Sequence, residues 1–294
     1  MKVVVTADDF GVTHGVNEAV SEAHEFGTLS STSIRTNGVA YKEGVTLLKS
    51  RLKGIGVGLH LNLTDGPSHT PSLSNEQGVY SRSFISYYRE IKSGQPHLKQ
   101  SIKNELRAQF EIIKRDSIRV DHIDGQDHIH MIPEIFEIVC QLASDYGVKA
   151  VRLSNEPFFL ISNIQQLRRS AMQLGFVKNF ILSSFAATNL RLLKKYNLVS
   201  TNRYFGVLYT SNMNLDVFTR AIDYGLYNKV ESIEIALHPG YSHFPSDVKF
   251  TSDFFRKYET SKARDSERKS LLSQQMKNLL SKKQIEICRF SDLA

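Results

Sequence analysis

Short apolar runs rich in β-branched residues alternate along the chain with longer segments in which apolar residues recur at helical spacing. The short runs predict strands at 2–6, 31–36, 56–63, 119–124, 148–153, 176–182, 203–208, 232–237 and 284–290. The longer segments predict helices at 15–26, 40–52, 98–115, 133–146, 163–174, 214–226 and 265–282. Because strand and helix follow one another repeatedly, the pattern is typical of a parallel sheet with helical connections.

The number of these strand and helix units favours one domain over two. No linker rich in Pro, Gly and Ser separates the units, so we expect residues 1–294 to form a single α/β domain, a closed or nearly closed parallel β/α barrel. The stretch 64–95 is rich in Gly, Pro and Ser and shows little periodicity. We therefore expect an excursion of loop and helix near 64–115 over one end of the barrel, which is typical of a lid or of the rim of a substrate cleft.

The composition is that of a folded protein, because 41% of the 294 residues are apolar. The formal net charge of +7 raises the alternative of a nucleic-acid binder. Most of the excess lies in residues 249–289, which carry eleven Lys and Arg against five acidic residues. Charge that is clustered on a C-terminal helix without interleaved aromatic residues favours a solvated face, so we expect no nucleic-acid partner.

The cysteines and the N-terminal segment indicate a reducing, aqueous environment. Cys140 and Cys288 both lie in apolar runs, which favours two buried free thiols over a disulfide or a zinc knuckle. The apolar run at the N-terminus is too short for a signal peptide and ends in two aspartates. No stretch approaches the roughly 20 apolar residues of a membrane span. We therefore expect a cytoplasmic protein with no membrane partner.

Unusual polar residues stand at the carboxyl ends of four predicted strands. Asp8 and Asp9 follow the first strand, His60 ends another, the run 122–130 ends a third, and a His-Pro-Gly sequence at 238–240 follows a late one. In a parallel barrel these strand ends share one face, where the active sites of such folds are built. Four separate segments therefore predict one site.

The first two of these segments are ambiguous when taken alone. An Asp after a strand is often only the N-cap of the next helix, and His60 could be a satisfied core histidine. Adjacent carboxylates point to opposite sides of an extended backbone, so one of Asp8 and Asp9 could bind a metal ion while the other faces a bound water. That division of labour suits metal-assisted hydrolysis.

The run 122–130 carries His, Asp, Gln, His and His at its even positions, which would face the same side of an extended chain. The spacing of His128 and His130 can place two imidazoles around one cation, and imidazole with carboxylate suits Zn²⁺ or another divalent ion. The alternative is that these polar residues cap the helix that begins near 133. His238 stands where a proton donor for a leaving group could lie, although a His-Pro-Gly sequence can equally be a turn.

Other residues on the same predicted face are candidates for substrate contacts. Arg152 ends a strand there and could orient Asp8, bind substrate or form a structural ion pair. Phe158, Phe159, Tyr241 and Phe244 follow strands and could stack on sugar rings or simply pack. Of these residues we select Arg152 and Tyr241 as the substrate-binding candidates.

Five segments of the chain occur in an order and an approximate spacing that belong to a known family. They are TADDFG at 6–11, GVGLHLNLTDGPS at 56–68, HIDGQDHIHMIPEIF at 122–136, VKAVRL at 148–153 and ALHPGY at 236–241. Together they resemble the YdjC-like carbohydrate deacetylases over nearly the whole chain. The resemblance implies an irregular β/α barrel related to the polysaccharide deacetylases, one divalent metal ion (Mg²⁺ or Zn²⁺), an acetylated mono- or oligosaccharide substrate of the chitooligosaccharide type, and a homodimer.

Residue roles follow from the same resemblance. Carried onto this sequence, it implies that Asp8 is the general base, that Asp9 and His60 are metal ligands, and that His238 is the acid. The remaining metal ligand is expected from the run 122–130.

The chain departs from the family pattern at this last ligand. Members commonly have a histidine at the position of Gln126, and an amide oxygen is a poorer ligand for a transition metal than imidazole. Three outcomes are open: His128 takes over as the ligand, Gln126 binds a harder ion such as Mg²⁺, or metal affinity and activity are reduced. We favour His128.

The resulting interpretation is metal-dependent hydrolysis of an acetyl amide. A metal ion on Asp9, His60 and His128 polarises the acetyl carbonyl, Asp8 takes the proton of the attacking water, and His238 protonates the leaving amine. Another metal-dependent amidohydrolase or phosphoesterase remains open, as does a sugar-binding homologue with weakened activity.

Overall fold

The computed structural model describes residues 1–163, 165, 167–168, 175–242, 257 and 260–293. The strands are β1 (Lys2–Phe10), β2 (Ser31–Ile34), β3 (Gly56–Leu61), β4 (His122–Gly125), β5 (Ala150–Val151), β6 (Arg203–Phe205), β7 (Ser232–Leu237) and β8 (Glu286–Cys288). The α-helices are α1 (His14–Phe26), α2 (Tyr41–Ser50), α3 (Phe84–Lys92), α4 (Leu98–Arg115), α5 (Pro133–Asp145), α7 (Gly175–Lys195), α8 (Leu215–Tyr227), α10 (Lys262–Leu272) and α11 (Gln274–Lys282). Short 3₁₀ helices lie at η1 (Pro71–Leu73), η2 (Gln126–Met131) and η3 (Phe290–Asp292).

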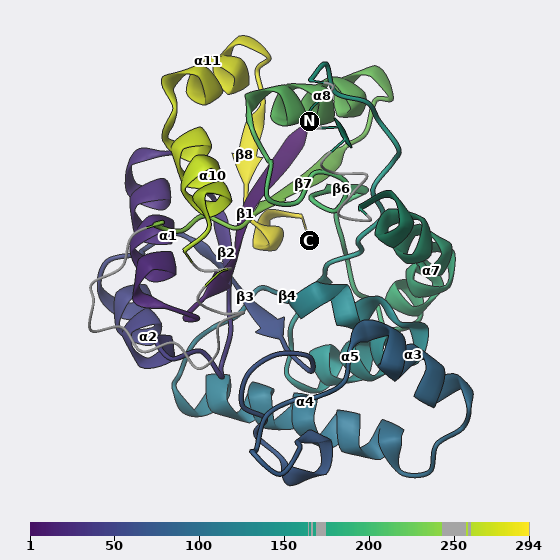
Figure 1. Ribbon diagram of the computed structural model, residues 1–294. Coiled ribbons are helices and arrows are strands. Elements are labelled where there is room, and N and C mark those ends of the chain that lie inside the picture. Colours follow the sequence, from purple (N-terminus) through teal and green to yellow (C-terminus); the bar gives the residue numbers. More distant parts are fainter. Residues whose placement is uncertain (164, 166, 169–174, 243–256, 258–259, 294) are drawn as a thin grey trace.

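The strands form one curled parallel sheet in the order β5-β4-β3-β2-β1-β7-β6. The second half of β1 pairs with β2, and its first half pairs with β8. At the far edges a parallel bridge joins Val199 to Ala150, and the Tyr204 amide donates to the Asn155 carbonyl at 3.4 Å. Helices surround the sheet in Figure 1. This architecture confirms the predicted irregular parallel β/α barrel.

Strand β1 is the centre of the core. Val3 and Val5 are fully buried in the main apolar cluster, whereas Val4 packs on the opposite face with Cys288 and Phe290. Because both faces of the strand are covered, its sequence is a continuous apolar run rather than an alternating one. Each buried valine stabilises the fold by about 1.5–3 kcal/mol, which fixes the strand that carries the site at its carboxyl end.

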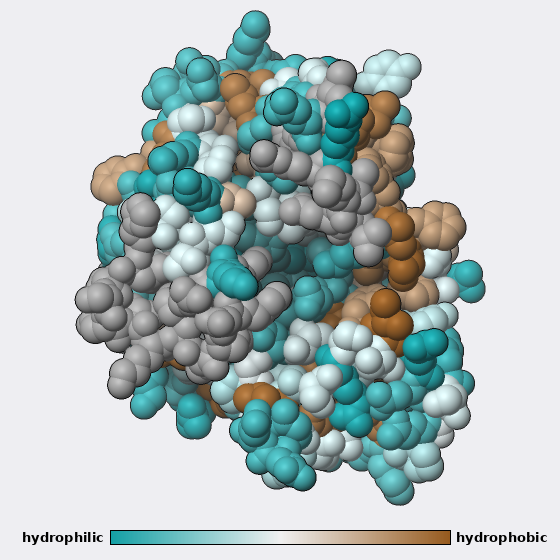
Figure 2. Space-filling model, in the orientation of Figure 1, coloured by the Kyte–Doolittle hydropathy of each residue, from teal (hydrophilic) through white to brown (hydrophobic). Residues whose placement is uncertain are grey.

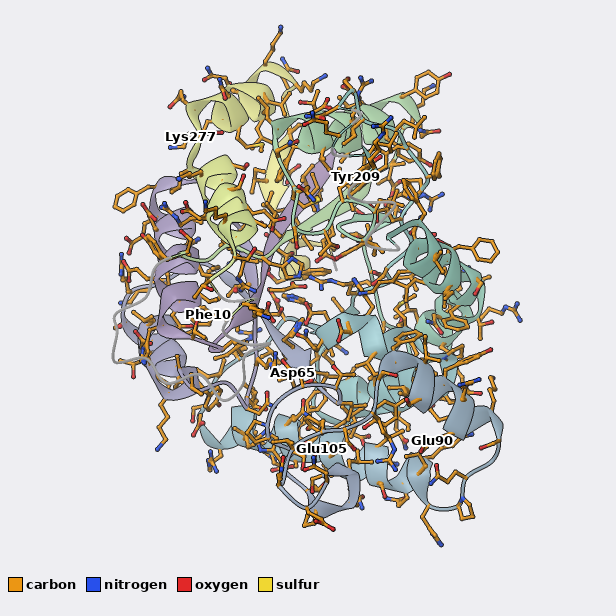
Figure 3. All side chains as sticks on the ribbon, viewed as in Figure 1. Phe10, Asp65, Glu90, Glu105, Tyr209 and Lys277 are labelled. Carbon is orange, nitrogen blue, oxygen red and sulfur yellow. The ribbon has the colours of Figure 1, made fainter. Side chains whose placement is uncertain are left out.

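The chain between β3 and α4 leaves the sheet and packs against α4. Buried Glu105 on α4 accepts hydrogen bonds from the amides of His69 and Thr70, at 3.1 and 2.7 Å, and from the Tyr80 hydroxyl. Figure 3 labels Glu105 on this helix. The loop is therefore held by a buried carboxylate, while α3, which lies within the excursion, has no counterpart among the predicted helices.

Two predicted elements differ from the structure. The predicted strand at 176–182 is wrong, because these residues lie in α7; a short apolar run does not by itself distinguish a strand from a buried helix. The predicted helix at 265–282 is two helices, because Ser273 is extended and its side chain accepts the Met276 amide to begin α11. Much of the predicted helix at 163–174 lies outside the described residues.

The cysteines agree with the expectation drawn from their apolar surroundings in the sequence. Cys140 and Cys288 are free and buried, as predicted. Within the part of the chain that the structure describes, every helix is too short or too polar to cross a membrane.

The loops that follow β5 and β6 are joined by one buried carboxylate. Glu156 accepts hydrogen bonds from the amides of Gly206, Val207 and Leu208, at 3.1, 2.7 and 2.8 Å. Burial nevertheless raises the pKa of Glu156 to about 7, because it outweighs the favourable effect of the three amides.

This shift predicts how stability depends on pH. The unfolded chain releases the Glu156 proton near pH 4.5 and the folded chain near pH 7, so between these values the folded state binds more protons. The free energy of unfolding therefore falls as the pH rises through this window, by up to about 3 kcal/mol from this group. We expect Glu156→Gln to flatten the slope, measured by urea unfolding at several pH values, and Glu76→Gln in an exposed loop to leave it unchanged. Equal slopes in the wild type and Glu156→Gln would contradict the assignment.

Candidate active site

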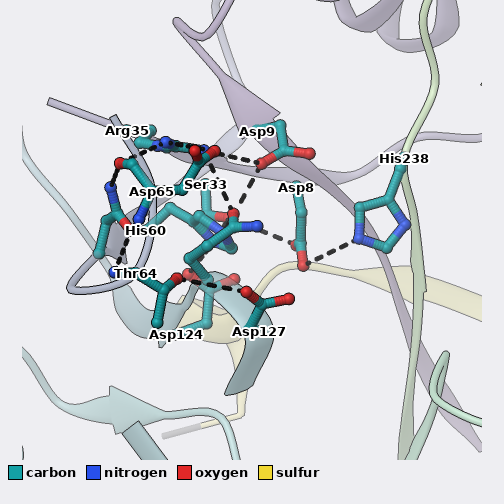
Figure 4. A network of polar contacts seen from close by, with 12 residues as sticks. Asp8, Asp9, Ser33, Arg35, His60, Thr64, Asp65, Asp124, Asp127 and His238 are labelled. Atoms are coloured by element: carbon teal, nitrogen blue, oxygen red, sulfur yellow. Dashed lines mark hydrogen bonds and ion pairs between the residues drawn. The ribbon is translucent and has the colours of Figure 1, made fainter. Parts of the chain in front are cut away.

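Side chains from the carboxyl ends of several strands converge on one face of the barrel. Asp8 and Asp9 come from β1, His60 from β3 and Asp124 from β4, and His238 directly follows β7. Figure 4 shows these residues facing one another. The molecular face in Figure 2 is hollowed near its centre, and the floor of the hollow is hydrophilic.

A bulge in β1 lets both adjacent aspartates face the site. The register between β1 and β2 shifts between Ala7 and Phe10, and Asp9 has a φ of 70°. In a regular strand neighbouring side chains alternate between faces, but an extra residue in left-handed conformation re-aims one of them. Such a conformation costs an aspartate roughly 1 kcal/mol, which is typical of functional positions.

Arg152 is fully buried and holds Asp8 in place. Its guanidinium donates two hydrogen bonds to the Asp8 carboxylate, at 2.7 and 2.8 Å, and two to Glu234, at 2.6 and 2.9 Å. It also forms an ion pair of 2.8 Å with Asp124 and lies over the ring of Tyr204. These contacts fit two of the three roles considered for Arg152, orienting Asp8 and forming a structural ion pair, and the substrate-binding role stays a prediction.

His60 lies between two carboxylates and an amide. Its Nδ1 lies 2.9 Å from Asp124 Oδ1, and its Nε2 lies 3.1 Å from Gln126 Oε1 and 3.8 Å from Asp9 Oδ1. Burial lowers the pKa of His60, but attraction to Asp124, Asp8 and Asp9, together with the Asp124 hydrogen bond, outweighs burial and raises it to about 9. Asp124 therefore fixes the ring so that Nε2 points toward Asp9.

Asp9 lies between two buried arginines from distant parts of the chain. Arg264 of α10 donates to Asp9 Oδ2 at 3.1 Å, and Arg35, directly after β2, lies 4.0 Å from Oδ1. Burial raises the pKa of Asp9, but attraction to Arg264, His60, His238 and Arg35 lowers it well below the usual range of an aspartate. Asp9 is thus a carboxylate anion at neutral pH.

The run 122–130 is not extended throughout. Only its start forms β4; residues from Gln126 onward form η2, in which Asp127 and His128 have φ values of 53° and 58°. The prediction that all its even positions share one side is therefore wrong. His122 instead stacks on Phe290, with ring centroids 4.1 Å apart.

His128 and His130 are both buried beside the site. His128 Nδ1 lies 2.8 Å from Ser154 Oγ, and His130 Nε2 donates to the Arg152 carbonyl at 3.2 Å. Burial lowers the pKa of His130 to about 3 and that of His128 well below its usual range. Both rings are neutral at neutral pH, which is the form that binds metals.

His238 faces Asp8 on one side and Glu267 on the other. Its Nε2 lies 3.9 Å from Asp8 Oδ2, and its Nδ1 lies 3.9 Å from Glu267 Oε2. Buried Glu267 of α10 also accepts the amides of His238 and Met213, at 2.7 and 3.1 Å. These bonds fix the backbone that carries the imidazole.

The aromatic candidates have defined contacts. The Tyr241 hydroxyl donates to Glu22 at 2.8 Å, and its ring lies 4.4 Å from the Arg268 guanidinium. Phe159 packs against Phe205, whereas Phe158 is 64% exposed. Phe244 lies outside the described residues.

Sequence reasoning missed four charged residues of the site. Glu234 could have been found, because it is a charge inside the apolar strand run SIEIAL. Arg35 lies near the carboxyl end of the predicted strand 31–36, the kind of position that singled out His60 in the predicted strand 56–63. Arg264 and Glu267 lie on an amphipathic helix that is rich in charge, and their spacing carries no signal.

Two overlapping sets of atoms could hold a metal ion. Ligand atoms of Asp8, His60 and Asp124, all buried, lie within 4.8 Å of one another. In that set both carboxylates already pair with Arg152. The second set consists of His60 Nε2 and two oxygens near it. Gln126 Oε1 lies 3.1 Å and Asp9 Oδ1 lies 3.8 Å from that nitrogen.

Curated relatives of the chain are named carbohydrate deacetylases. One from Brevibacillus brevis is 36% identical over 155 residues, which are 50% of this chain and 58% of that protein. Another from Clostridium beijerinckii is 26% identical over 296 residues, which span all of both chains. The chain thus matches little more than half the length of the relative from Brevibacillus brevis.

Solved structures share the fold. One from Enterococcus faecalis V583, described as a candidate cellobiose-phosphate cleavage protein, has a TM-score of 0.75 and 20% identity, with 100% of this chain and 98% of that chain covered. An uncharacterised protein from Agrobacterium tumefaciens C58 has a TM-score of 0.50 and 9% identity, with 100% and 89% covered.

The model of one protein family, described as YdjC-like protein, matches residues 2–282. The match contains all the strand ends that build the site and nearly all of the barrel. The chain therefore belongs to the YdjC-like protein family.

Proposed function

We propose that this protein is a metal-dependent carbohydrate deacetylase that removes acetyl groups from N-acetylated sugars of the chitooligosaccharide type. The observation that carries the proposal is the placement of Asp8 and His238 3.9 Å apart, beside Asp9 and His60, at the carboxyl ends of the strands. Hydrolysis of an amide needs a base for water and an acid for the amine, and these two residues can serve as that pair. The names of the relatives support the same reaction.

The donor chemistry of the site fits a divalent cation. Asp9 supplies an anionic oxygen, and His60 supplies a ring nitrogen that Asp124 orients from behind, as metal-binding histidines require. We propose Asp9 and His60 as two ligands and a residue of η2 as the third. Gln126 Oε1 lies nearest to His60 Nε2, while His128, which contacts Ser154 through Nδ1, would bind through Nε2. When bound, the ion would polarise the acetyl carbonyl and acidify water.

Asp8 acts as the general base in this proposal. Arg152 holds both of its oxygens, and Ser33 donates to Oδ1 at 3.3 Å, so the carboxylate has one orientation. The oxygen of a water molecule bonds to the acetyl carbon, and the proton that the water loses passes to Asp8. Positioning of this kind provides much of the rate enhancement of a general base.

His238 acts as the general acid. The bond between the acetyl carbon and nitrogen breaks, its electron pair stays on nitrogen, and that nitrogen takes a proton from His238. The products are acetate and the free amine of the sugar, and the proton on Asp8 restores His238 through solvent. Glu267 accepts the His238 amide at 2.7 Å and so fixes the backbone that carries the acid. We place Tyr241 at the rim as a substrate contact because it follows His238 by three residues.

A sugar-binding homologue with weakened activity is the second candidate. The observation that favours it is Gln126, whose amide oxygen is a weaker ligand than imidazole. Release of acetate from N-acetylglucosamine oligomers, with and without 6-phosphate and with Mg²⁺ or Zn²⁺ added, separates the candidates. Acetate release supports the deacetylase, sugar binding without acetate release supports the homologue, and phosphate release from phosphoesters alone would overturn both.

Replacement of Asp8 tests the assignment of the base. We expect Asp8→Asn to lower the rate of acetate release on the order of 10²- to 10⁴-fold, because the proton acceptor is lost. Calorimetric metal affinity should persist, because Asp9 and His60 remain. Asp145→Asn, an exposed carboxylate at the end of α5, is the matched control. If Asp8→Asn loses the metal and keeps its rate, the roles of Asp8 and Asp9 must be exchanged.

Replacement of Gln126 decides the third ligand. If the amide oxygen of Gln126 binds the ion, Gln126→His should tighten Zn²⁺ on the order of 10- to 100-fold, because Zn²⁺ prefers imidazole to an amide oxygen. The sequence favoured His128, but we now expect the result for Gln126, since Gln126 Oε1 lies 3.1 Å from His60 Nε2. Unchanged Zn²⁺ affinity in calorimetric titration would instead assign the third ligand to His128.

A further inference from the structure

Arg35 places a buried guanidinium against the proposed metal ligands. The residue follows β2 directly, and its side chain is 3% exposed. Its Nη1 donates to Gln126 Oε1 at 3.4 Å and lies 4.0 Å from Asp9 Oδ1. Figure 4 shows Arg35 lying beside Asp9 in the network of polar contacts. A positively charged group of the chain itself thus reaches the oxygens that a metal ion would use.

The remaining contacts of Arg35 hold it in this position. Its Nη2 donates to the carbonyl of Asp65 at 2.8 Å and to Asp65 Oδ2 at 3.0 Å, and its Nε donates to Asn37 at 2.9 Å. Asp65 belongs to the excursion after β3, and its side chain is 21% exposed. The excursion therefore supplies the counter-charge for Arg35.

Two oxygens of the proposed metal site, Gln126 Oε1 and Asp9 Oδ1, also lie beside Arg35. His60 Nε2 lies 3.1 Å from Gln126 Oε1 and 3.8 Å from Asp9 Oδ1, and Arg35 approaches the same two oxygens. Arginine keeps its charge at every pH at which the protein is folded, so it does not yield by losing a proton. A divalent cation between these oxygens meets a second positive charge at short range, where repulsion is strong in a buried site.

We propose that Arg35 competes with a divalent metal ion for Asp9 Oδ1 and Gln126 Oε1 and thereby sets the metal affinity of the site. Binding of the ion requires Nη1 to withdraw, and Asp65 retains the guanidinium when it does. Arg35 therefore weakens metal binding without preventing it, because the guanidinium keeps Asp65 as a carboxylate partner both with and without the ion. This inference rests on the metal-binding part of the proposed function.

Arg264 provides a matched comparison. It also pairs with Asp9, but through Oδ2 at 3.1 Å, whereas His60 Nε2 lies beside Oδ1. Removing either arginine deletes one positive charge beside the same carboxylate. Arg35, in contrast, approaches Gln126 Oε1 and Asp9 Oδ1, the two oxygens that lie beside His60 Nε2.

The test is calorimetric titration of the full chain with ZnCl₂ and MgCl₂. We expect Arg35→Met, which keeps an unbranched apolar stem and removes the guanidinium with its charge, to tighten binding on the order of 10- to 100-fold. Arg264→Met should tighten it less. Unchanged or weaker binding in Arg35→Met overturns the proposal, and so does equal tightening in the two variants, which would assign the effect to general charge.

Two further variants keep the test decisive. Arg35→Lys retains the charge but loses the planar fork that spans Asp65 and Gln126, so we expect intermediate tightening; if Arg35→Met does not fold, unchanged binding in Arg35→Lys overturns the proposal. Asp9→Asn in the Arg35→Met background should abolish the gain in affinity, and a gain that survives would place the ion elsewhere.

If neither the wild type nor Arg35→Met binds metal, the metal-binding part of the proposed function fails as well. Tight wild-type binding that Arg35→Met leaves unchanged overturns this inference alone.

Discussion

The buried guanidinium of Arg152 is the interaction on which the site depends. It joins Asp8 of β1, Asp124 of β4 and Glu234 of β7, so three strands of the curled sheet share one cation. Burying so many charges is costly, and removal of one partner from such a cluster typically costs about 3–5 kcal/mol because uncompensated charge is left behind. The same cluster orients Asp8 directly and His60 through Asp124. The positions of the proposed base and of one proposed metal ligand therefore have one origin.

Much of the fold follows from the periodicity of the sequence. The helix 98–115 and the strand 232–237 begin and end where the pattern predicts, because a clear helical stripe and a buried β-branched run each identify one type of element. The segment 176–182 fails for the opposite reason, since its aromatic and aliphatic residues suit a buried strand and a helix equally well. Helix α7 continues to Lys195, and only that length marks it as a helix.

From the sequence, only the site residues at the carboxyl ends of strands could be predicted. Asp8, His60 and His238 lie together because parallel strands bring their carboxyl ends to one face, and that rule needs no knowledge of packing. Arg264 and Glu267 enter the site from α10, far along the chain from Asp9, and no local spacing encodes such a contact. The directions of the side chains in η2 could not be predicted either, because two residues in left-handed conformation end the alternation of side chains that a strand would have.

The balance of charge links these features. Carboxylates outnumber guanidinium groups in the network around the site: Asp8, Asp9, Asp65, Asp124 and Glu234 face Arg35, Arg152 and Arg264. A proton on His60, whose pKa is raised to about 9, offsets part of this excess, and a divalent cation offsets more of it. Both stabilise the same set of anions, so the binding of a metal ion at His60 Nε2 must release the proton held there. The arginines thus reduce the negative charge available to a cation without removing it, and the metal affinity of the proposed site would be set by a small difference between large opposing charges.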